Sequence, residues 1–295
     1  MFLVVMTIFL IYVVSFIIFE YSDNTFFTFE KSGDWHLWLF SFIGLLAMAI
    51  VMMRFAKRMD QRISHEQAEK ENQMRRELTQ NIAHELKTPV ASILGYTETI
   101  LDNPEMDAET KSQFIDRTHV QAQRLTALLQ DISTLNRMDY ARDMLKMESV
   151  NVSQLVADIA QETALACERK QMTFRNCIPS GIIINGNPSL LYSVFRNLVD
   201  NSINHAGEGS TIVLDAKAED SYWRFYYSDD GVGIAEEHLP RIFERFYRID
   251  KGRSRSLGGT GLGLAIVKNA ILIHGGSIVA QSSVKGLAFE FTLKK

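Results

Sequence analysis

Two long apolar runs near the start of the chain restrict what its first segment can form. Residues 1–19 are apolar except for Thr7, Ser15 and the ring hydroxyl of Tyr12, and a second apolar run covers about 36–55. A helix of about 20 apolar residues spans the hydrocarbon core of a bilayer. The sequence therefore predicts two transmembrane helices, about 1–19 and 36–55, in preference to two buried core helices.

The residues that flank these runs predict an orientation in the membrane. A basic start and a small-residue cleavage site, which a signal peptide needs, are both lacking, so an uncleaved anchor is favoured. The short loop of residues 20–34 is acidic, whereas Arg54, Lys57, Arg58 and Arg62 follow the second run. Because basic residues stay on the cytoplasmic side, we expect a multi-pass protein of the cytoplasmic membrane with everything after Arg54 in the cytoplasm.

Residues 81–90, NIAHELKTPV, hold a candidate nucleophile. Leu78, Ile82 and Leu86 recur every four residues and predict one buried helix face. His84 lies about 200° around the helix from that face, so its imidazole is expected to point outward beside the carboxylate of Glu85. An exposed histidine beside an acid is a candidate nucleophile, and the alternative is an ordinary solvated side chain.

Thr88 and Pro89 complete this stretch. The hydroxyl of Thr88 comes one helical turn after His84 on the same face. Pro89 has no N–H, so the carbonyl of Glu85 loses its helical partner there and the helix is free to bend.

A heptad pattern follows the turn of residues 102–107. Two antiparallel helices with one wide apolar face each do not close a core alone, whereas two such hairpins form a four-helix bundle. The sequence therefore predicts a homodimer. The seam residues alternate in steps of three and four: Ile115, Thr118, Ala122, Leu125, Leu129, Ile132 and Asn136.

From about Met147 the sequence predicts alternating helices and strands. Net charge is −4 and the pI is about 6.0, so a nucleic-acid partner is not indicated. The two cysteines lie ten residues apart without metal-ligand spacing, which favours free thiols. Helices are expected at 152–169, from Pro188, at 242–248 and up to His274, and strands at 172–178, 181–184, 210–218, 222–229, 277–283 and 287–293.

Polar residues on the helix after Pro188 and at the end of the strand 222–229 are candidate ligand contacts. Asn197, Asn201 and His205 share one helix face, and an Asn carbonyl can ligate Mg²⁺. The alternative is a row of surface amides. By strand parity Asp229 falls on the apolar side of its strand, where a carboxylate needs a partner such as an adenine amino group. Gly231 and Gly233 allow a tight turn or close approach to a ligand, although a plain polar turn has the same pattern.

A glycine-rich segment then leads into an amphipathic helix. Backbone N–H groups at the start of such a helix form an anion site. The spacing is neither that of a Walker loop nor that of a Rossmann turn. The segment comprises Gly258, Gly259, Thr260, Gly261, Leu262 and Gly263.

Five blocks together resemble the bacterial two-component sensor histidine kinases, over about 76–295. They are 84–89 (HELKTP), 197–205, 229–233 (DDGVG), 242–248 (IFERFYR) and 258–263 (GGTGLG). The resemblance implies a multidomain fold class: two transmembrane helices, a dimeric four-helix-bundle hairpin, and an α/β two-layer sandwich ATP-binding domain like that of gyrase and Hsp90. The expected domains are a membrane anchor at 1–56, a signalling helix with the phosphotransfer hairpin at 57–144, and a catalytic domain at 145–295.

The resemblance also implies roles for individual residues. His84 would be the phosphoacceptor, Glu85 the acid that activates it, and Thr88 the residue that places water for the reverse reaction. Asn201 would bind Mg²⁺ with Asn197 beside it, and Asp229 would read adenine. The remaining nucleotide contacts would come from Asn204, His205, Gly231, Gly233 and the lid residues Gly258, Gly259, Thr260, Gly261, Leu262 and Gly263, with Phe243 and Phe246 anchoring the lid.

The function that follows is ATP-dependent autophosphorylation of His84 and transfer to an aspartate of a response regulator, with phosphatase activity in reverse. Two departures from the family pattern stand out: Asn204 replaces a common lysine and Asp230 replaces a common asparagine. The alternatives are a kinase-inactive nucleotide-binding scaffold, for which Asn204 is the hint, and an ATP-driven clamp of the gyrase type. The exposed histidine and the anchor argue against the clamp.

Overall fold

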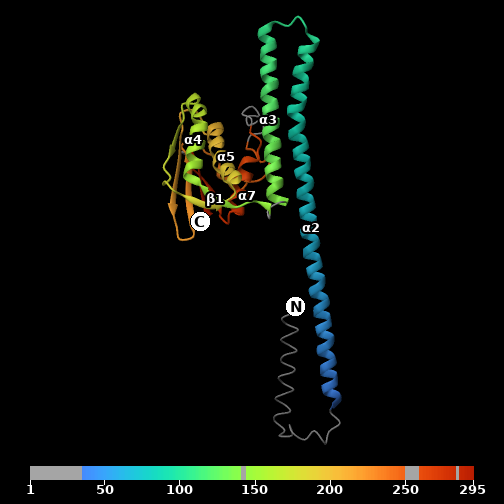
Figure 1. Ribbon diagram of the computed structural model, residues 1–295. Coiled ribbons are helices and arrows are strands. Elements are labelled where there is room, and N and C mark those ends of the chain that lie inside the picture. Colours follow the sequence, from blue (N-terminus) through green and yellow to red (C-terminus); the bar gives the residue numbers. More distant parts are fainter. Residues whose placement is uncertain (1–34, 141–143, 250–258, 284–285) are drawn as a thin grey trace. The chain divides into compact units, whose positions relative to one another are not determined.

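A computed structural model shows a long helical hairpin and an α/β domain (Figure 1). It describes residues 35–140, 144–249, 259–283 and 286–295, with side chains from Ile43 onward apart from a few positions. The chain divides into two compact units, Met1–Met74 and Arg75–Lys295.

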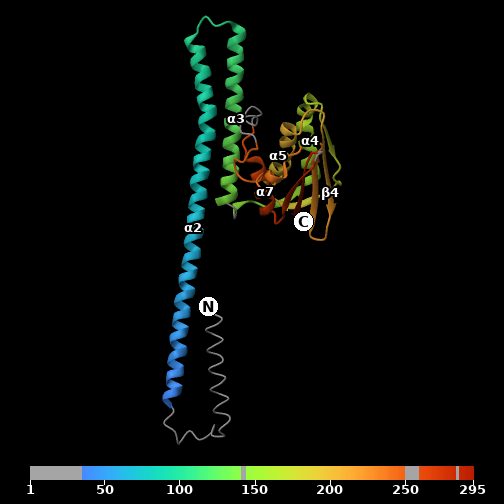
Figure 2. The same cartoon turned by 180° about the vertical axis from the view of Figure 1, so that it is seen from behind.

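Helix α2 (Trp35–Asp102) and helix α3 (Ala108–Tyr140) form the hairpin, and α2 continues through Pro89. The carboxylate of Asp107 starts α3, because its Oδ1 accepts the N–H of Thr110 at 2.8 Å, as an N-cap does. Figure 2 shows the antiparallel course of α3 beside the last part of α2.

The predicted membrane spans fall mostly outside what the structure describes. Span 1–19 lies outside the described residues, and span 36–55 falls on α2, where the first side chain described is that of Ile43. Across the described part of the chain, no helix is both long and apolar enough to cross a membrane.

The predicted heptad seam of α3 is only partly covered. Ile115 and Leu129 are 52% and 51% exposed, whereas Leu128, Leu135 and Met138 are buried. The latter three belong to the same apolar core as the helices of the α/β domain, and α3 packs against α7. One face of α3 is therefore occupied within the chain, and the Ile115–Leu129 side stays open.

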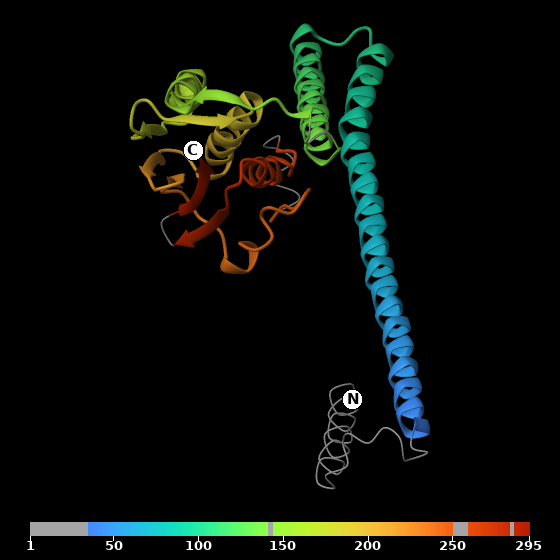
Figure 3. The same cartoon turned by 60° about the horizontal axis from the view of Figure 1, so that its bottom comes forward.

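The α/β domain has two layers. A five-stranded sheet in the order β2-β4-β5-β7-β6 is antiparallel except for the β2–β4 pair, and helices α4, α5 and α7 cover one of its faces (Figures 1 and 3). A small antiparallel sheet joins β1 to β3. The bounds are β1 Glu148–Asn151, α4 Val152–Arg169, β2 Thr173–Asn176, β3 Ile183–Gly186, α5 Pro188–His205, β4 Thr211–Ala218, β5 Tyr222–Asp229, the 3₁₀ turn η2 Glu236–His238, α7 Gly263–Ile273, β6 Ile278–Ser283 and β7 Gly286–Lys294.

An aromatic cluster joins α5 to the sheet. The rings of Phe225 on β5 and Phe291 on β7 stack at 5.0 Å with an interplanar angle of 9°, and Phe195 on α5 meets Phe225 edge-on at 5.4 Å. All three side chains are at most 1% exposed. Phe225 and Tyr227 alternate along β5 and both face this core.

Three predictions about the elements were wrong or incomplete. Strand β1 was not predicted, and β3 lies two residues later than expected because it pairs with β1. The helix expected at 242–248 is a series of turns. Phe246 has φ 63°, outside the helical range, and its N–H donates to the carbonyl of Gly261 at 2.8 Å, so a distant backbone contact replaces the helical bond.

His274 is the C-cap residue of α7, and it also links α7 to the start of α5. Its Nδ1 lies 2.7 Å from the carbonyl of Ala270, and its Nε2 accepts the N–H of Asn187 at 2.9 Å. Since Nε2 must accept, the ring is neutral in this arrangement. Burial lowers the pKa of His274 below its ordinary value.

We expect His274→Gln to destabilise the protein by about 1–3 kcal/mol at pH 8, the cost of losing buried hydrogen bonds. Because the folded-state pKa lies below 6.5, the contribution of His274 is complete above about pH 6.5 and is lost as the pH falls through the lowered value. Denaturant melts of wild type and variant should therefore converge at acidic pH. A stability difference that stays constant from pH 8 to 5.5 would contradict this role.

Candidate functional site

His84 lies exposed on α2 next to a half-buried carboxylate. Its side chain is 67% exposed, and its Nδ1 is 3.9 Å from Oε1 of Glu85, whose side chain is 15% exposed. This distance is longer than a hydrogen bond. The hydroxyl of Thr88 donates to the carbonyl of His84 at 3.4 Å. The predicted outward direction of His84 is confirmed, with Nε2 as the nitrogen that does not face Glu85.

Two arginines that the sequence did not assign to this site meet Glu85. Arg124 of α3 and Arg248 of the α/β domain place guanidinium nitrogens 3.5 and 3.6 Å from Oε2 of Glu85. Both arginine side chains are at most 10% exposed. The pairing balances the half-buried carboxylate, and it leaves Oε1 on the side of His84. Sequence offers no signal for it, because the partners are distant along the chain.

Further polar contacts join α3 to the segment between β5 and α7. Both terminal nitrogens of Arg245 donate N–H groups to the carboxylate of Asp139, each at 2.8 Å. The hydroxyl of Thr260 donates to the carboxylate of Asp131 at 2.7 Å. Burial raises the pKa of Asp131, an effect that the Thr260 hydrogen bond opposes. The segment that carries the predicted lid is therefore held to the hairpin at several points.

The polar row on α5 forms as predicted. Asn197 donates its amide N–H to the carbonyl of Ser193 at 2.8 Å, and Asn201 and Asn204 are half-buried. The ring of His205 is exposed in part, yet its pKa is lowered. Desolvation by neighbouring atoms is the largest cause, and the positive charges of Lys170 and Arg248 lower the pKa further. The imidazole therefore favours its neutral form.

Asp229 is buried at the end of β5, as strand parity predicted, with 7% exposure. Its Oδ2 accepts the hydroxyl of Ser202 on α5 at 2.6 Å. Its Oδ1 lies 3.2 Å from the N–H of Gly231 and 3.4 Å from that of Leu287. The partners that strand parity required for this carboxylate thus come in part from the protein itself. Ser202 was not identified as one of them from the sequence.

Two glycines allow the segments around them to pack closely against α5 and the residue that follows it. A Cβ on Gly231 would lie 2.3 Å from the carbonyl oxygen of Ala206, just after α5, and a Cβ on Gly263 would lie 2.6 Å from Oδ1 of Asn197. Gly233 has φ 62°. The glycine turn after β5 and the start of α7 are therefore both packed against α5.

The glycine-rich segment is only partly described. Gly258 lies outside the described residues, as do the basic residues Lys251, Arg253 and Arg255 of the preceding loop. Gly259 and Thr260 are half-buried, Gly261 has φ 72°, and Leu262 is fully buried. Thr260 contacts Asp131 on α3, and Phe243 packs on Phe289 with ring centroids 6.1 Å apart.

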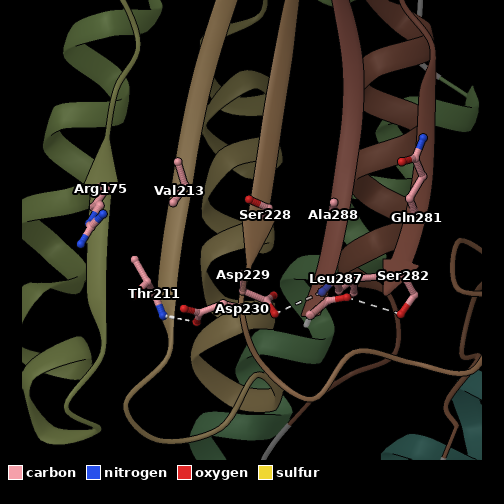
Figure 4. Close-up of a pocket in the computed structure, with 11 residues that line it drawn as sticks. Arg175, Thr211, Val213, Ser228, Asp229, Asp230, Gln281, Ser282, Leu287 and Ala288 are labelled. Carbon is pink, nitrogen blue, oxygen red and sulfur yellow. Dashed lines mark hydrogen bonds between the residues drawn. The ribbon is translucent and has the colours of Figure 1, made fainter. Parts of the chain in front are cut away.

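A depression of about 530 Å³ lies on the face of the five-stranded sheet that helices α4, α5 and α7 do not cover (Figure 4). Its floor is one cross-strand row, Arg175, Val213, Ser228, Ala288 and Gln281, and its edge includes the Asp229 turn. Neither α5 nor α7 contributes a lining residue among those described. This depression is therefore separate from the polar row of α5.

Two family models match the chain. Residues 74–141 match the His Kinase A (phospho-acceptor) domain, and residues 186–295 match the histidine kinase-, DNA gyrase B- and HSP90-like ATPase. The first covers the hairpin with His84, and the second covers α5, β4, β5, α7, β6 and β7.

Curated relatives agree with both models. The chain is 33% identical over 219 residues to the sensor-like histidine kinase SenX3 of Mycolicibacterium smegmatis, covering 74% of this chain and 56% of the relative. It is 30% identical over 228 residues to the sensor histidine kinase WalK of Bacillus subtilis, covering 76% of this chain and 37% of the relative. The chain thus spans about half the length, or less, of these relatives.

Solved structures share the fold. The histidine kinase AdeS of Acinetobacter baumannii aligns with a TM-score of 0.60 at 21% identity, over 72% of this chain and 97% of that one. Full-length ShkA in complex with AMPPNP aligns with a TM-score of 0.55 at 25% identity, over 72% of this chain and 44% of that one. The predicted architecture of a helical hairpin followed by an α/β sandwich ATPase domain is confirmed, and the chain belongs to the two-component sensor histidine kinases.

Proposed function

We propose that this protein is a membrane-bound histidine kinase that moves the γ-phosphoryl group of ATP to its own His84 and then to an aspartate of a response regulator. The observation that carries the proposal is the exposed imidazole of His84 beside Glu85, a carboxylate that is paired with arginine. Both lie on a helical hairpin that is followed in the same chain by an ATPase fold. The relatives named above are sensor histidine kinases. A kinase-inactive scaffold is not favoured, because His84, Asn201 and Asp229 all stand at their motif positions.

The chemistry asks for a neutral imidazole with one free lone pair. Nδ1 of His84 lies 3.9 Å from Oε1 of Glu85, and closing this distance to a hydrogen bond would keep the proton on Nδ1 and leave the lone pair on Nε2. In the transfer a bond forms between Nε2 and the γ-phosphorus while the bond to the bridging oxygen breaks and ADP leaves. Glu85 then stabilises the positive charge that develops on the ring. For the reverse reaction, Thr88 places the attacking water.

The α5 face supplies the nucleotide contacts of this proposal. Asp229 reads the adenine amino group, Asn204, His205, Gly231 and Gly233 lie along the nucleotide, and the segment 258–263 covers its phosphates. These proposed contacts are consistent with the close packing of Gly231 and Gly263 against α5, which brings both glycine segments beside the polar residues of that helix. The domain limits that follow are 57–144 for the hairpin with its signalling helix and 145–295 for the ATP-binding domain.

Mg²⁺ fits the amide oxygens of α5. Asn201 is half-buried, and its side chain makes no hydrogen bond with the described residues, whereas the nitrogen of Asn197 is bonded to Ser193 and its oxygen lies close to Gly263 at the start of α7. Amide oxygen is a ligand type that Mg²⁺ takes together with phosphates and waters. Asn201 would hold the ion, with Asn197 beside it, and the ion would offset phosphate charge.

A homodimer and a response regulator are the proposed partners. Val90, Leu94 and Leu101 on α2 are 41%, 54% and 77% exposed, and Ile115 and Leu129 on α3 are equally open. Such apolar residues on both helices of a hairpin suit a four-helix bundle with a second copy. The response regulator follows from the family, in which histidine kinase ThkA has been solved in complex with response regulator protein TrrA.

His84→Gln should abolish acid-labile labelling from [γ-³²P]ATP while leaving ATP binding unchanged, because the nucleophile is lost and the α5 site is intact. His65→Gln, an exposed histidine on the same helix, serves as the matched control and should label normally. Autoradiography of the full chain in detergent measures both. Labelling of the His84 variant at the wild-type level would overturn the phosphoacceptor assignment.

Asn201→Ala should weaken Mg²⁺-dependent ATP binding by at least about tenfold, since even an outer-shell partner of a metal site is worth 10–100-fold. The control is Asn185→Ala, which changes an exposed asparagine on β3. Titration calorimetry with Mg²⁺ and with EDTA separates the metal-dependent part. Equal affinity of the Asn201 variant and wild type in Mg²⁺ would argue against this ion site.

We also propose that residues 1–56 anchor the protein in the bacterial cytoplasmic membrane. Ile43, Leu46, Val51 and Phe55 are 51–65% exposed and point to different sides of α2, where a soluble protein would bury them. Full-length protein should stay with membranes after an alkaline carbonate wash, whereas the chain from Lys57 onward should not. Release of the full chain by the wash would contradict the anchor.

A further inference from the structure

A buried chain of hydroxyl groups ends at Asp229. The hydroxyl of Tyr227 lies 2.9 Å from Oγ of Ser202 and 2.9 Å from the carbonyl of Leu198, and Oγ of Ser202 lies 2.6 Å from Oδ2 of Asp229. Tyr227 and Ser202 are each 1% exposed. Two adjacent elements, α5 and β5, thus meet through these three side chains.

The direction of each proton in this chain is fixed by chemistry. An ionised carboxylate only accepts hydrogen bonds, so the single proton of Ser202 lies on the bond to Asp229. Burial raises the pKa of Tyr227 well above its ordinary value, so the phenol keeps its proton. That proton goes to the carbonyl of Leu198 or to Oγ of Ser202, which are its two acceptors. Neither the Tyr227 proton nor the Ser202 proton is therefore left for a ligand.

The oxygens that remain are acceptors of limited number. A carboxylate has about four lone-pair positions. On Asp229, Ser202 takes one, and the N–H groups of Gly231 and Leu287 lie near two more. One lone-pair position on Oδ2 of Asp229 is therefore left for a ligand. This position accepts a hydrogen bond and cannot donate one.

We propose that Ser202 and Tyr227 are positioning residues that orient Asp229 as an acceptor-only contact and so make the site select adenine over guanine. The inference rests on the proposed binding of ATP at Asp229. Adenine presents an amino group at C6, which donates to the acceptor, whereas guanine presents a carbonyl there and places oxygen against oxygen. Sites built to bond one group reject an analogue without it because buried polar atoms are left unpaired.

Ser202→Ala removes the bond that fixes Oδ2, so the carboxylate is free to turn or to take a water. We expect the Kd for Mg²⁺-ATP to rise on the order of tenfold. The ratio of the Kd for Mg²⁺-GTP to that for Mg²⁺-ATP should fall by a similar factor, since GTP gains nothing from the lost bond. Calorimetry on the full chain in detergent measures both nucleotides.

Tyr227→Phe tests the same chain with a nearly isosteric change, should the Ser202 variant not fold. The Ser202–Asp229 bond remains in it, so the GTP to ATP ratio should fall by a smaller factor, about threefold. Ser193→Ala is the matched control and should keep the wild-type ratio, because among the described residues the Ser193 hydroxyl is bonded only to the Ser189 carbonyl on α5. A purely structural defect would weaken ATP and GTP equally and leave the ratio unchanged.

Asp229→Asn separates this inference from the proposed function. If wild type fails to bind ATP, or if the Asp229 variant binds it as wild type does, ATP recognition at Asp229 is wrong and the inference is overturned with it. If Asp229→Asn loses ATP binding while the folded Ser202 and Tyr227 variants keep the wild-type GTP to ATP ratio, only the positioning role is overturned. A lowered ratio in these variants supports the positioning role.

Discussion

The packing of α5 on the sheet is the constraint on which the proposed nucleotide site depends. Phe195 meets Phe225 and Phe291 in a fully buried cluster, and this contact fixes the rotation of α5 about its own axis. With that face inward, Ser202 is directed at Asp229, and Asn197 and Asn201 lie at the edge of the interface. The apolar core therefore decides which polar side chains can reach a ligand.

The hairpin and the α/β domain are joined by charge as well as by apolar contact. Glu85 beside His84 is paired with Arg124 from its own hairpin and with Arg248 from the other domain. The pairs of Arg245 with Asp139 and of Thr260 with Asp131 involve the same connecting segment. The acid that neighbours the proposed nucleophile is thus electrostatically coupled to the nucleotide-binding domain, so movement of that domain changes the charge around His84.

Local patterns predicted much of this fold because the forces behind them are local. The step of four through Leu78, Ile82 and Leu86 identified the outward side of α2 and hence the exposure of His84. Strand parity along β5 placed Asp229 in the core, and Pro188 marked the start of α5. The expected helix at 242–248 failed because Phe246 bonds to Gly261, a contact that no local pattern contains.

The sequence by itself determined the order of the elements, the exposed histidine and the motif that identifies the family, since each depends on periodicity or on residue type at fixed spacing. Only the tertiary structure decided the partners. Ser202 for Asp229, two arginines for Glu85 and His274 between two helices are all pairings across the chain. Such pairings arise when packed elements bring polar groups together out of water, where each must find a partner.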